Sequence, residues 1–212
     1  RAIARLYREH LTIFIDKETG EKHIADIHTS HNLVIEFQHS AIKPEEITSR
    51  EKFYKNMVWV IDCTRLKRDF PRFLKAKNNF RNTEKKEVFL VDNLDEVFPE
   101  NWINRKIPLI FDFKGIKKTE ITDIQNNLYC LLPIRIGRYA LVAEISRNAF
   151  INSTTSGEWS LRIKKFLDDI SKPIEELKNQ NTSQQRNANH KKITPTHYYD
   201  PRKQKFVRRR RF

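Results

Sequence analysis

The stretch Lys22–Asp62 (KHIADIHTSHNLVIEFQHSAIKPEEITSREKFYKNMVWVID) determines which fold the sequence predicts. It contains two carboxylates, Asp26 and Glu36, which lie ten residues apart, and Gln38 follows two residues later. Apolar residues recur at short spacing around all three, as they do in strands. The stretch continues through Pro-Glu-Glu, which favours the start of a helix, and ends in MVWVID, which is typical of a strand buried on both faces. This order predicts a compact α/β unit.

The two carboxylates are expected on neighbouring strands. Side chains alternate along Leu33–Gln38, so Glu36 and Gln38 share one face of that strand. If Lys22–His28 pairs with it, Asp26 projects beside Glu36. Two such carboxylates repel each other unless a cation compensates them, and an oxygen site with open positions suits Mg²⁺ or Mn²⁺. We therefore expect both carboxylates to bind a metal that activates water against a phosphodiester, and Gln38 to orient that water or the phosphate.

Composition narrows the classes of ligand. The 212-residue chain has only 4 Gly and neither G-x-G-x-x-G nor G-x-x-x-x-G-K-[ST], so a nucleotide cofactor is not expected. Its formal charge is +14, and residues 181–212 alone hold ten Lys or Arg against one acid, Asp200. Polyanions are therefore the expected partners, with nucleic acid ahead of a membrane surface. No apolar run reaches the roughly 18 residues of a membrane span.

The two cysteines indicate a compartment. Cys63 and Cys130 stand far apart and without CxxC spacing, which predicts buried thiols rather than a zinc site. Such thiols are typical of a reducing compartment, and we expect the cytoplasm. The only methionine is Met57, so a segment N-terminal to Arg1 is also expected.

Three regions are predicted along the chain. Residues 1–80 form the core, residues 81–180 form an appended α/β region, and residues 181–212 form a basic tail. The tail has little to bury and is predicted to be disordered. The appended region ends in a long amphipathic helix over Gly157–Lys178. Its predicted strands are Glu87–Val91, Pro108–Phe113, Leu128–Pro133 and Tyr139–Ile145.

Several of these segments resemble a known family. The likeness is carried by HIADI (His23–Ile27), IEFQHS (Ile35–Ser40), the stretch Pro44–Tyr54 and VWVID (Val58–Asp62). They are similar to the PD-(D/E)XK nuclease superfamily, and more closely to its competence protein CoiA-like branch. The resemblance implies a restriction-endonuclease-like core with a mixed central sheet and a Mg²⁺-dependent deoxyribonuclease. It also implies DNA processing with recombination or DNA-uptake proteins as partners. Within it, Asp26 and Glu36 correspond to the metal ligands, and Gln38 stands in place of the usual Lys.

Further side chains are expected to contact the nucleic acid: His39, Ser40, Arg50, Tyr54, Arg65, Lys67, Arg68 and Arg72. The last four follow the buried strand directly and suit contacts to the phosphate backbone. Ser40 also suits a cap of the following turn, Arg50 a solvated helix face, and Tyr54 the core. Two more carboxylates lie in predicted strands, namely Asp62, which suits a functional group or a bond to its neighbours, and Asp112, which we expect to be structural.

Two other functions are compatible with the same residues. The chain can be a catalytically inactive nucleic-acid-binding module, or an adaptor of a DNA-processing or defence complex that docks through its tail. A nuclease loses activity but keeps DNA binding when Asp26 or Glu36 is replaced by alanine. A binding module shows steep salt dependence without metal-dependent cleavage.

Overall fold

The computed structural model describes residues 12–15, 20, 22–114, 124–172 and 197–208. The chain divides into two compact units, residues 1–165 and residues 166–212. The first unit contains a large sheet, and the second contains a two-stranded hairpin. In the described ranges, no helix combines the length and the apolar character that crossing a bilayer requires.

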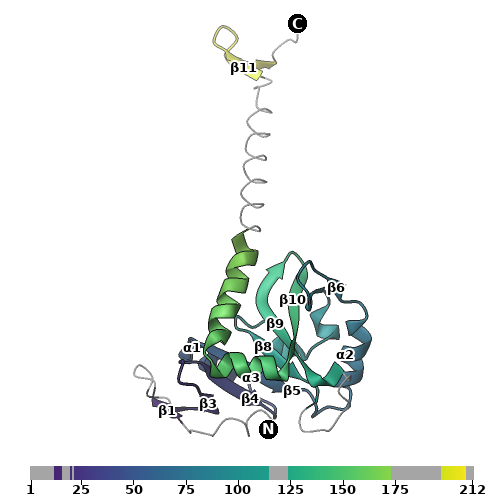
Figure 1. The fold of residues 1–212 in the computed structure, drawn as a ribbon. Coiled ribbons are helices and arrows are strands. Elements are labelled where there is room, and N and C mark those ends of the chain that lie inside the picture. Colours follow the sequence, from purple (N-terminus) through teal and green to yellow (C-terminus); the bar gives the residue numbers. More distant parts are fainter. Residues whose placement is uncertain (1–11, 16–19, 21, 115–123, 173–196, 209–212) are drawn as a thin grey trace. The chain divides into compact units, whose positions relative to one another are not determined.

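The sheet of the first unit has eight strands in the order β3-β4-β5-β8-β9-β10-β7-β6 (Figure 1). β4 pairs with β5 and β5 with β8 in parallel, and the remaining neighbours are antiparallel. β1 (Thr12–Ile15) and β2 (Lys22–Ala25) form a separate antiparallel pair. The strands of the large sheet are β3 (Ile27–His28), β4 (Val34–Gln38), β5 (Met57–Asp62), β6 (Arg81–Asn82), β7 (Val88–Val91), β8 (Leu109–Asp112), β9 (Asn127–Ile136) and β10 (Tyr139–Ser146).

Helix α1 (Pro44–Phe53) provides the crossover that the parallel strands β4 and β5 need. Pro44 stands in its first turn, and Glu45 and Glu46 lie at the positive end of its dipole. The helix ends before Tyr54, whose backbone is extended. Ile47 is fully buried in the same apolar cluster as the sheet, so α1 packs on the face that carries this cluster.

The other helical elements lie between and after the later strands. Ser146 caps α3 by accepting a 3.1 Å hydrogen bond from the backbone N–H of Ala149, as the N-terminus of a helix requires. Residues 158–172 are also helical, within the predicted Gly157–Lys178, whose last six residues lie outside the described part. The elements are α2 (Asp69–Lys77), η2 (Leu94–Glu96), η3 (Glu100–Trp102), η4 (Ile124–Asn126) and α3 (Arg147–Thr155).

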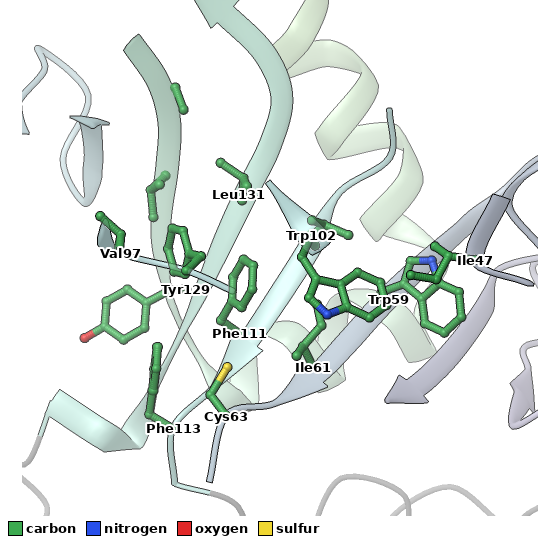
Figure 2. Close-up of a cluster of buried hydrophobic side chains, with 14 of the residues drawn as sticks. Ile47, Trp59, Ile61, Cys63, Val97, Trp102, Phe111, Phe113, Tyr129 and Leu131 are labelled. Carbon is green, nitrogen blue, oxygen red and sulfur yellow. The ribbon is translucent and has the colours of Figure 1, made fainter. Parts of the chain in front are cut away.

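One face of the sheet carries a continuous apolar cluster (Figure 2). Trp59 and Ile61 of β5 and Phe111 of β8 belong to it. The alternate residues Val60 and Ile110 point to the opposite face and are buried as well. β5 is therefore covered on both faces, as its apolar sequence predicts, and its neighbour β4 lies inside the sheet rather than at an edge.

The register of β4 explains why a carboxylate is buried. Glu36 pairs with Trp59 and Gln38 with Ile61, so both polar side chains lie on the face of the apolar cluster. Glu36 is only 2 % exposed, whereas Gln38, at the end of the strand, is half-buried. The sheet thus forces one charged group into an apolar environment.

The predicted mixed α/β fold is confirmed, and two features differ from the expectation. The sheet continues across residue 80, because β8 pairs directly with β5. The tail is not disordered throughout, because β11 (His197–Asp200) and β12 (Lys205–Arg208) form an antiparallel hairpin. Asp200 closes its turn by accepting a 3.0 Å hydrogen bond from the backbone N–H of Arg202. Aromatic and β-branched residues on both sides of an Asp-Pro turn favour such a hairpin. The rest of the predicted disordered segment, 181–196 and 209–212, lies outside the described residues.

Candidate functional site

Asp26 separates two short strands, and its carboxylate points toward β4. It lies between β2 and β3, and its Oδ2 accepts a 2.7 Å hydrogen bond from the backbone N–H of Phe37. Because Ile27 pairs with Ile35 in an antiparallel ladder, the preceding residue, Asp26, lies level with Glu36. The structure therefore brings together the two carboxylates that the sequence singles out.

The surroundings of Glu36 favour its neutral form. Burial raises the pKa of its carboxyl, the nearby Arg50 lowers it, and the negative charge of Asp26 raises it again. The net effect raises the pKa from 4.5 to about 7. A carboxylate in this state gains more from an added cation than an exposed one does, because water does not already stabilise its charge.

Arg50 of α1 is part of this site. Its Nη1 donates a 2.9 Å hydrogen bond to Oε2 of Glu36, and its Nη2 lies 3.1 Å from Oε1 of Glu46. The Arg50 side chain is 24 % exposed and also lies 3.4 Å from the carbonyl oxygen of Ile24. The sequence suggests a DNA contact or a solvated helix face for Arg50, and the structure shows that it forms an ion pair with Glu36.

The second oxygen of Glu36 has no partner among the described residues. Its Oε1 is buried and accepts no hydrogen bond from the described residues. A buried, unpaired carboxylate oxygen is costly and is a natural ligand for a hard cation. Among the residues that the structure covers, no group of three His, Cys, Asp or Glu side chains is arranged to hold a metal. The carboxylate pair nevertheless fits Mg²⁺, which binds through one or two carboxylates and keeps waters and substrate oxygens as its other ligands.

A pocket of about 500 Å³ lies at the C-terminal ends of β4 and β5. In sheets with parallel strands, ligands bind in crevices at this end. Asp26 and Glu36 do not line it, and Lys67, which is exposed, lies outside its lining too. Six residues that the sequence selects do line it, namely Gln38, His39, Ser40, Arg65, Arg68 and Arg72.

Gln38 connects the carboxylate pair to the pocket. It lies on the same face of β4 as Glu36 and lines the pocket, and its Nε2 donates a 2.5 Å hydrogen bond to the carbonyl oxygen of Ser40.

Tyr54 has a different place from the one expected for a nucleic-acid contact. It is only 5 % exposed and packs edge-on against the rings of His23 and Phe53. Tyr54 is therefore a core residue. It follows the last residue of α1, where the chain turns into β5, and this turn buries its side chain.

Sequence reasoning missed the partner of His39. Its Nδ1 lies 2.6 Å from Oδ2 of Asp62, 23 residues away. Asp62 also accepts two hydrogen bonds from Thr64, through the backbone N–H and the hydroxyl. Burial works to raise the pKa of Asp62, but the hydrogen bonds from Thr64 and His39 outweigh it and the pKa is lowered. Asp62 thus stays ionised and holds the imidazole. In the sequence, the position of Asp62 at the end of a buried strand is the only indication that it holds another side chain.

Asp112 has a structural role, as expected. It is 8 % exposed and forms two hydrogen bonds with the guanidinium of Arg147, the first residue of α3. Its Oδ1 also accepts a 2.9 Å hydrogen bond from the backbone N–H of Lys114. These contacts tie the end of β8 to the start of α3.

One family model matches part of the chain. Residues 20–96 match the family model of the competence protein CoiA, nuclease-like domain. The match contains Asp26, Glu36 and Gln38, together with the basic residues that line the pocket. Neither a curated protein nor a solved structure matches the chain.

Proposed function

We propose that this protein is a metal-dependent deoxyribonuclease, and the match of residues 20–96 to the nuclease-like domain model of the competence protein CoiA supports this proposal. It hydrolyses phosphodiester bonds at Asp26 and Glu36. The observation that carries this proposal is the buried Glu36 carboxyl, which has a raised pKa, an adjacent carboxylate and one oxygen without a partner. Such perturbed groups gather at functional sites.

The residues have separate tasks in this proposal. Asp26 and Glu36 hold Mg²⁺ or Mn²⁺, which supplies Lewis-acid stabilisation of the charge that develops at phosphorus and an activated water. Gln38 orients the water or the phosphate through its side-chain amide, which the Ser40 carbonyl oxygen fixes in place. Arg50 keeps Glu36 oriented from the side of α1. A carboxylate whose orientation is already fixed in this way needs little reorganisation when substrate binds.

Exposed basic residues next to the pocket hold the DNA backbone. Arg65, Lys67 and Arg68 are exposed, and none of the three forms an ion pair with a residue of the described part. Their charges are therefore available to phosphates, and contacts of this kind make affinity fall with salt. Recombination or DNA-uptake proteins are the further partners that we propose. The free, buried thiols of Cys63 and Cys130 suit the reducing cytoplasm.

A second candidate function follows from Arg50. Its guanidinium already compensates the charge of Glu36, and Gln38 carries no charge. A site with these two features suits a nucleic-acid-binding module without catalysis, or an adaptor of a DNA-processing or defence complex. The two functions differ in whether a divalent metal binds.

The deciding experiment compares the native chain with Glu36→Ala. Linear, circular and single-stranded DNA are incubated with Mg²⁺ or Mn²⁺, and DNA affinity is measured in parallel at several salt concentrations. Bound Mn²⁺ is detected by electron paramagnetic resonance. A nuclease cuts DNA and binds Mn²⁺, and the variant loses both properties but keeps its DNA affinity. DNA binding without Mn²⁺ binding or cleavage by the native chain favours the second function.

A further inference from the structure

The pocket at the ends of β4 and β5 is a cavity that the carboxylate pair does not account for. Its volume of about 500 Å³ is in the range of sites for small organic ligands. Gln38 belongs to both places, because it lines the pocket and lies two residues beyond Glu36 on the same face of β4. Two residues of a strand span about 7 Å, which is comparable to the distance between successive phosphates of a nucleic-acid strand. The pocket therefore begins about one such spacing from Glu36 along β4.

Three arginines line the pocket within residues 65–72. They are Arg65 and Arg68, which form no ion pair within the described chain, and Arg72, which lies 3.2 Å from Asp69, itself a lining residue. His39 also lines the pocket, and its Nδ1 is engaged by Asp62. Because Asp62 is ionised, it accepts the proton of Nδ1, and the Nε2 atom is left for a second partner. The guanidinium groups of the arginines suit a phosphate group.

The lining residues of η2 and η3 have a different chemistry. The short helical segments η2 and η3 contribute Asp95, Glu100 and Asn101, and the indole of Trp102 adds an apolar surface that is 5 % exposed. An isolated phosphate ion gains nothing from these residues, and their carboxylates repel it. A ligand that suits both groups of lining residues carries a phosphate and, on a flat apolar body, hydrogen-bond donors.

We propose that this pocket binds a nucleoside 5′-monophosphate unit, with the phosphate at Arg65 and Arg68 and the base toward Trp102 and Asp95. The source of this unit is the 5′-phosphorylated end of a DNA strand. This inference rests on the proposed nuclease function and adds a substrate class to it. A protein with such a pocket prefers strands that have a 5′-phosphorylated end and acts on linear DNA in preference to circular DNA.

The test measures binding without cleavage. The full chain is titrated in EDTA with two labelled single-stranded oligonucleotides of equal sequence, one with a 5′-phosphate and one with a 5′-hydroxyl, and separately with deoxyadenosine 5′-monophosphate. We expect the 5′-phosphate to improve affinity at least about tenfold, as a charge-assisted hydrogen bond does. Arg68→Ala removes this preference. Lys67→Ala, which deletes a neighbouring charge outside the pocket, weakens binding of both strands alike and keeps the preference.

Failure of the pocket and failure of the nuclease function give different results. Equal affinity for the two oligonucleotides, or an unchanged preference in Arg68→Ala, overturns the pocket assignment whether or not DNA is cut. A tenfold preference in a chain that leaves all DNA uncut with Mg²⁺ and Mn²⁺ supports the pocket and refutes the nuclease. Tight binding of the mononucleotide without preference between the strands overturns the strand end as its source. Cleavage of circular and linear single strands at equal rates also overturns the assignment of the pocket to a strand end.

Discussion

Replacing Glu36 by glutamine should stabilise the folded protein at alkaline pH and change little at acidic pH. The pKa of the Glu36 carboxyl rises from 4.5 to about 7 in the folded state. Between these two values the folded state binds a proton that the unfolded state has released, so stability decreases as pH rises through this window. A difference of this size corresponds to about 3 kcal/mol, all of it lost above pH 7. Glutamine resembles the protonated form and does not incur this loss.

The free energy of unfolding is measured by urea denaturation at pH 5 and pH 8, in EDTA. We expect Glu36→Gln to be close to the native protein at pH 5 and more stable at pH 8 by up to about 3 kcal/mol. Glu46→Gln is the matched control, because Glu46 contacts the same Arg50 but its side chain is 50 % exposed. Exposed pairs of this kind contribute about 0.5 kcal/mol. Because the control keeps Glu36, its free energy of unfolding should fall between pH 5 and pH 8 by about as much as that of the native protein.

A loss of stability in Glu36→Gln at pH 8 would refute the reasoning. It would mean that the ion pair with Arg50 outweighs the cost of burying the charge, and that Glu36 is a structural residue. The expected result has a functional meaning as well. A carboxylate that destabilises the fold at neutral pH is retained for some other task, and a cation bound to it recovers the lost stability.

Three further predictions concern the rest of the molecule. Asp112→Ala should lower the free energy of unfolding by about 3 kcal/mol, because it leaves the partly buried guanidinium of Arg147 without its carboxylate partner, and a second substitution, Arg147→Met, should recover part of the loss. Gly157→Ala should lower it by about 1–3 kcal/mol, because Gly157 has φ +79° and a Cβ atom there would lie 2.5 Å from the ring of His31. The thiol of Cys130 should react with a disulfide reagent only after unfolding, since burial raises its pKa to about 12.

Each of these has an outcome that contradicts it. An equal loss in the single and double variants of the Asp112 pair would assign the effect to packing rather than to charge. Gly137→Ala is the control for Gly157, because Gly137 has φ +60° but open space around it, and equal losses at both would exclude the contact with His31. Fast reaction of Cys130 in the folded protein would show that β9 opens readily.

The elements that the sequence predicts well are those with a strong local signal. The run MVWVID gives a buried strand, and Pro-Glu-Glu gives the start of α1. The hairpin of the tail was missed because its strands are only four residues long and stand in a segment whose overall composition is polar. Composition averages over such short elements, whereas the alternation and the Asp-Pro turn that form the hairpin are local.

The carboxylate pair was predictable because it depends on alternation and on one strand pairing, which are properties of neighbouring segments. The contacts that modify the site were not predictable from the sequence. His39 and Asp62 are 23 residues apart, and Arg50 reaches Glu36 across the crossover helix. The face that α1 presents to β4 depends on how the helix packs on the sheet, and no local pattern specifies it. The same argument applies to Tyr54, whose four-residue spacing from Arg50 suits either a surface or a core position.

The position of Arg50 bears directly on how Glu36 is used. One oxygen of Glu36 faces a guanidinium at 2.9 Å and the other is buried without a partner. If Glu36 served only as the ion-pair partner of Arg50, burial of its second oxygen would cost free energy without compensation. A neutral side chain at this position would then give a more stable fold. A cation on Oε1 removes this cost and leaves the contact to Arg50 in place. Arg50 is then a positioning residue that fixes the orientation of the carboxylate, and its presence does not argue against a metal at the same side chain.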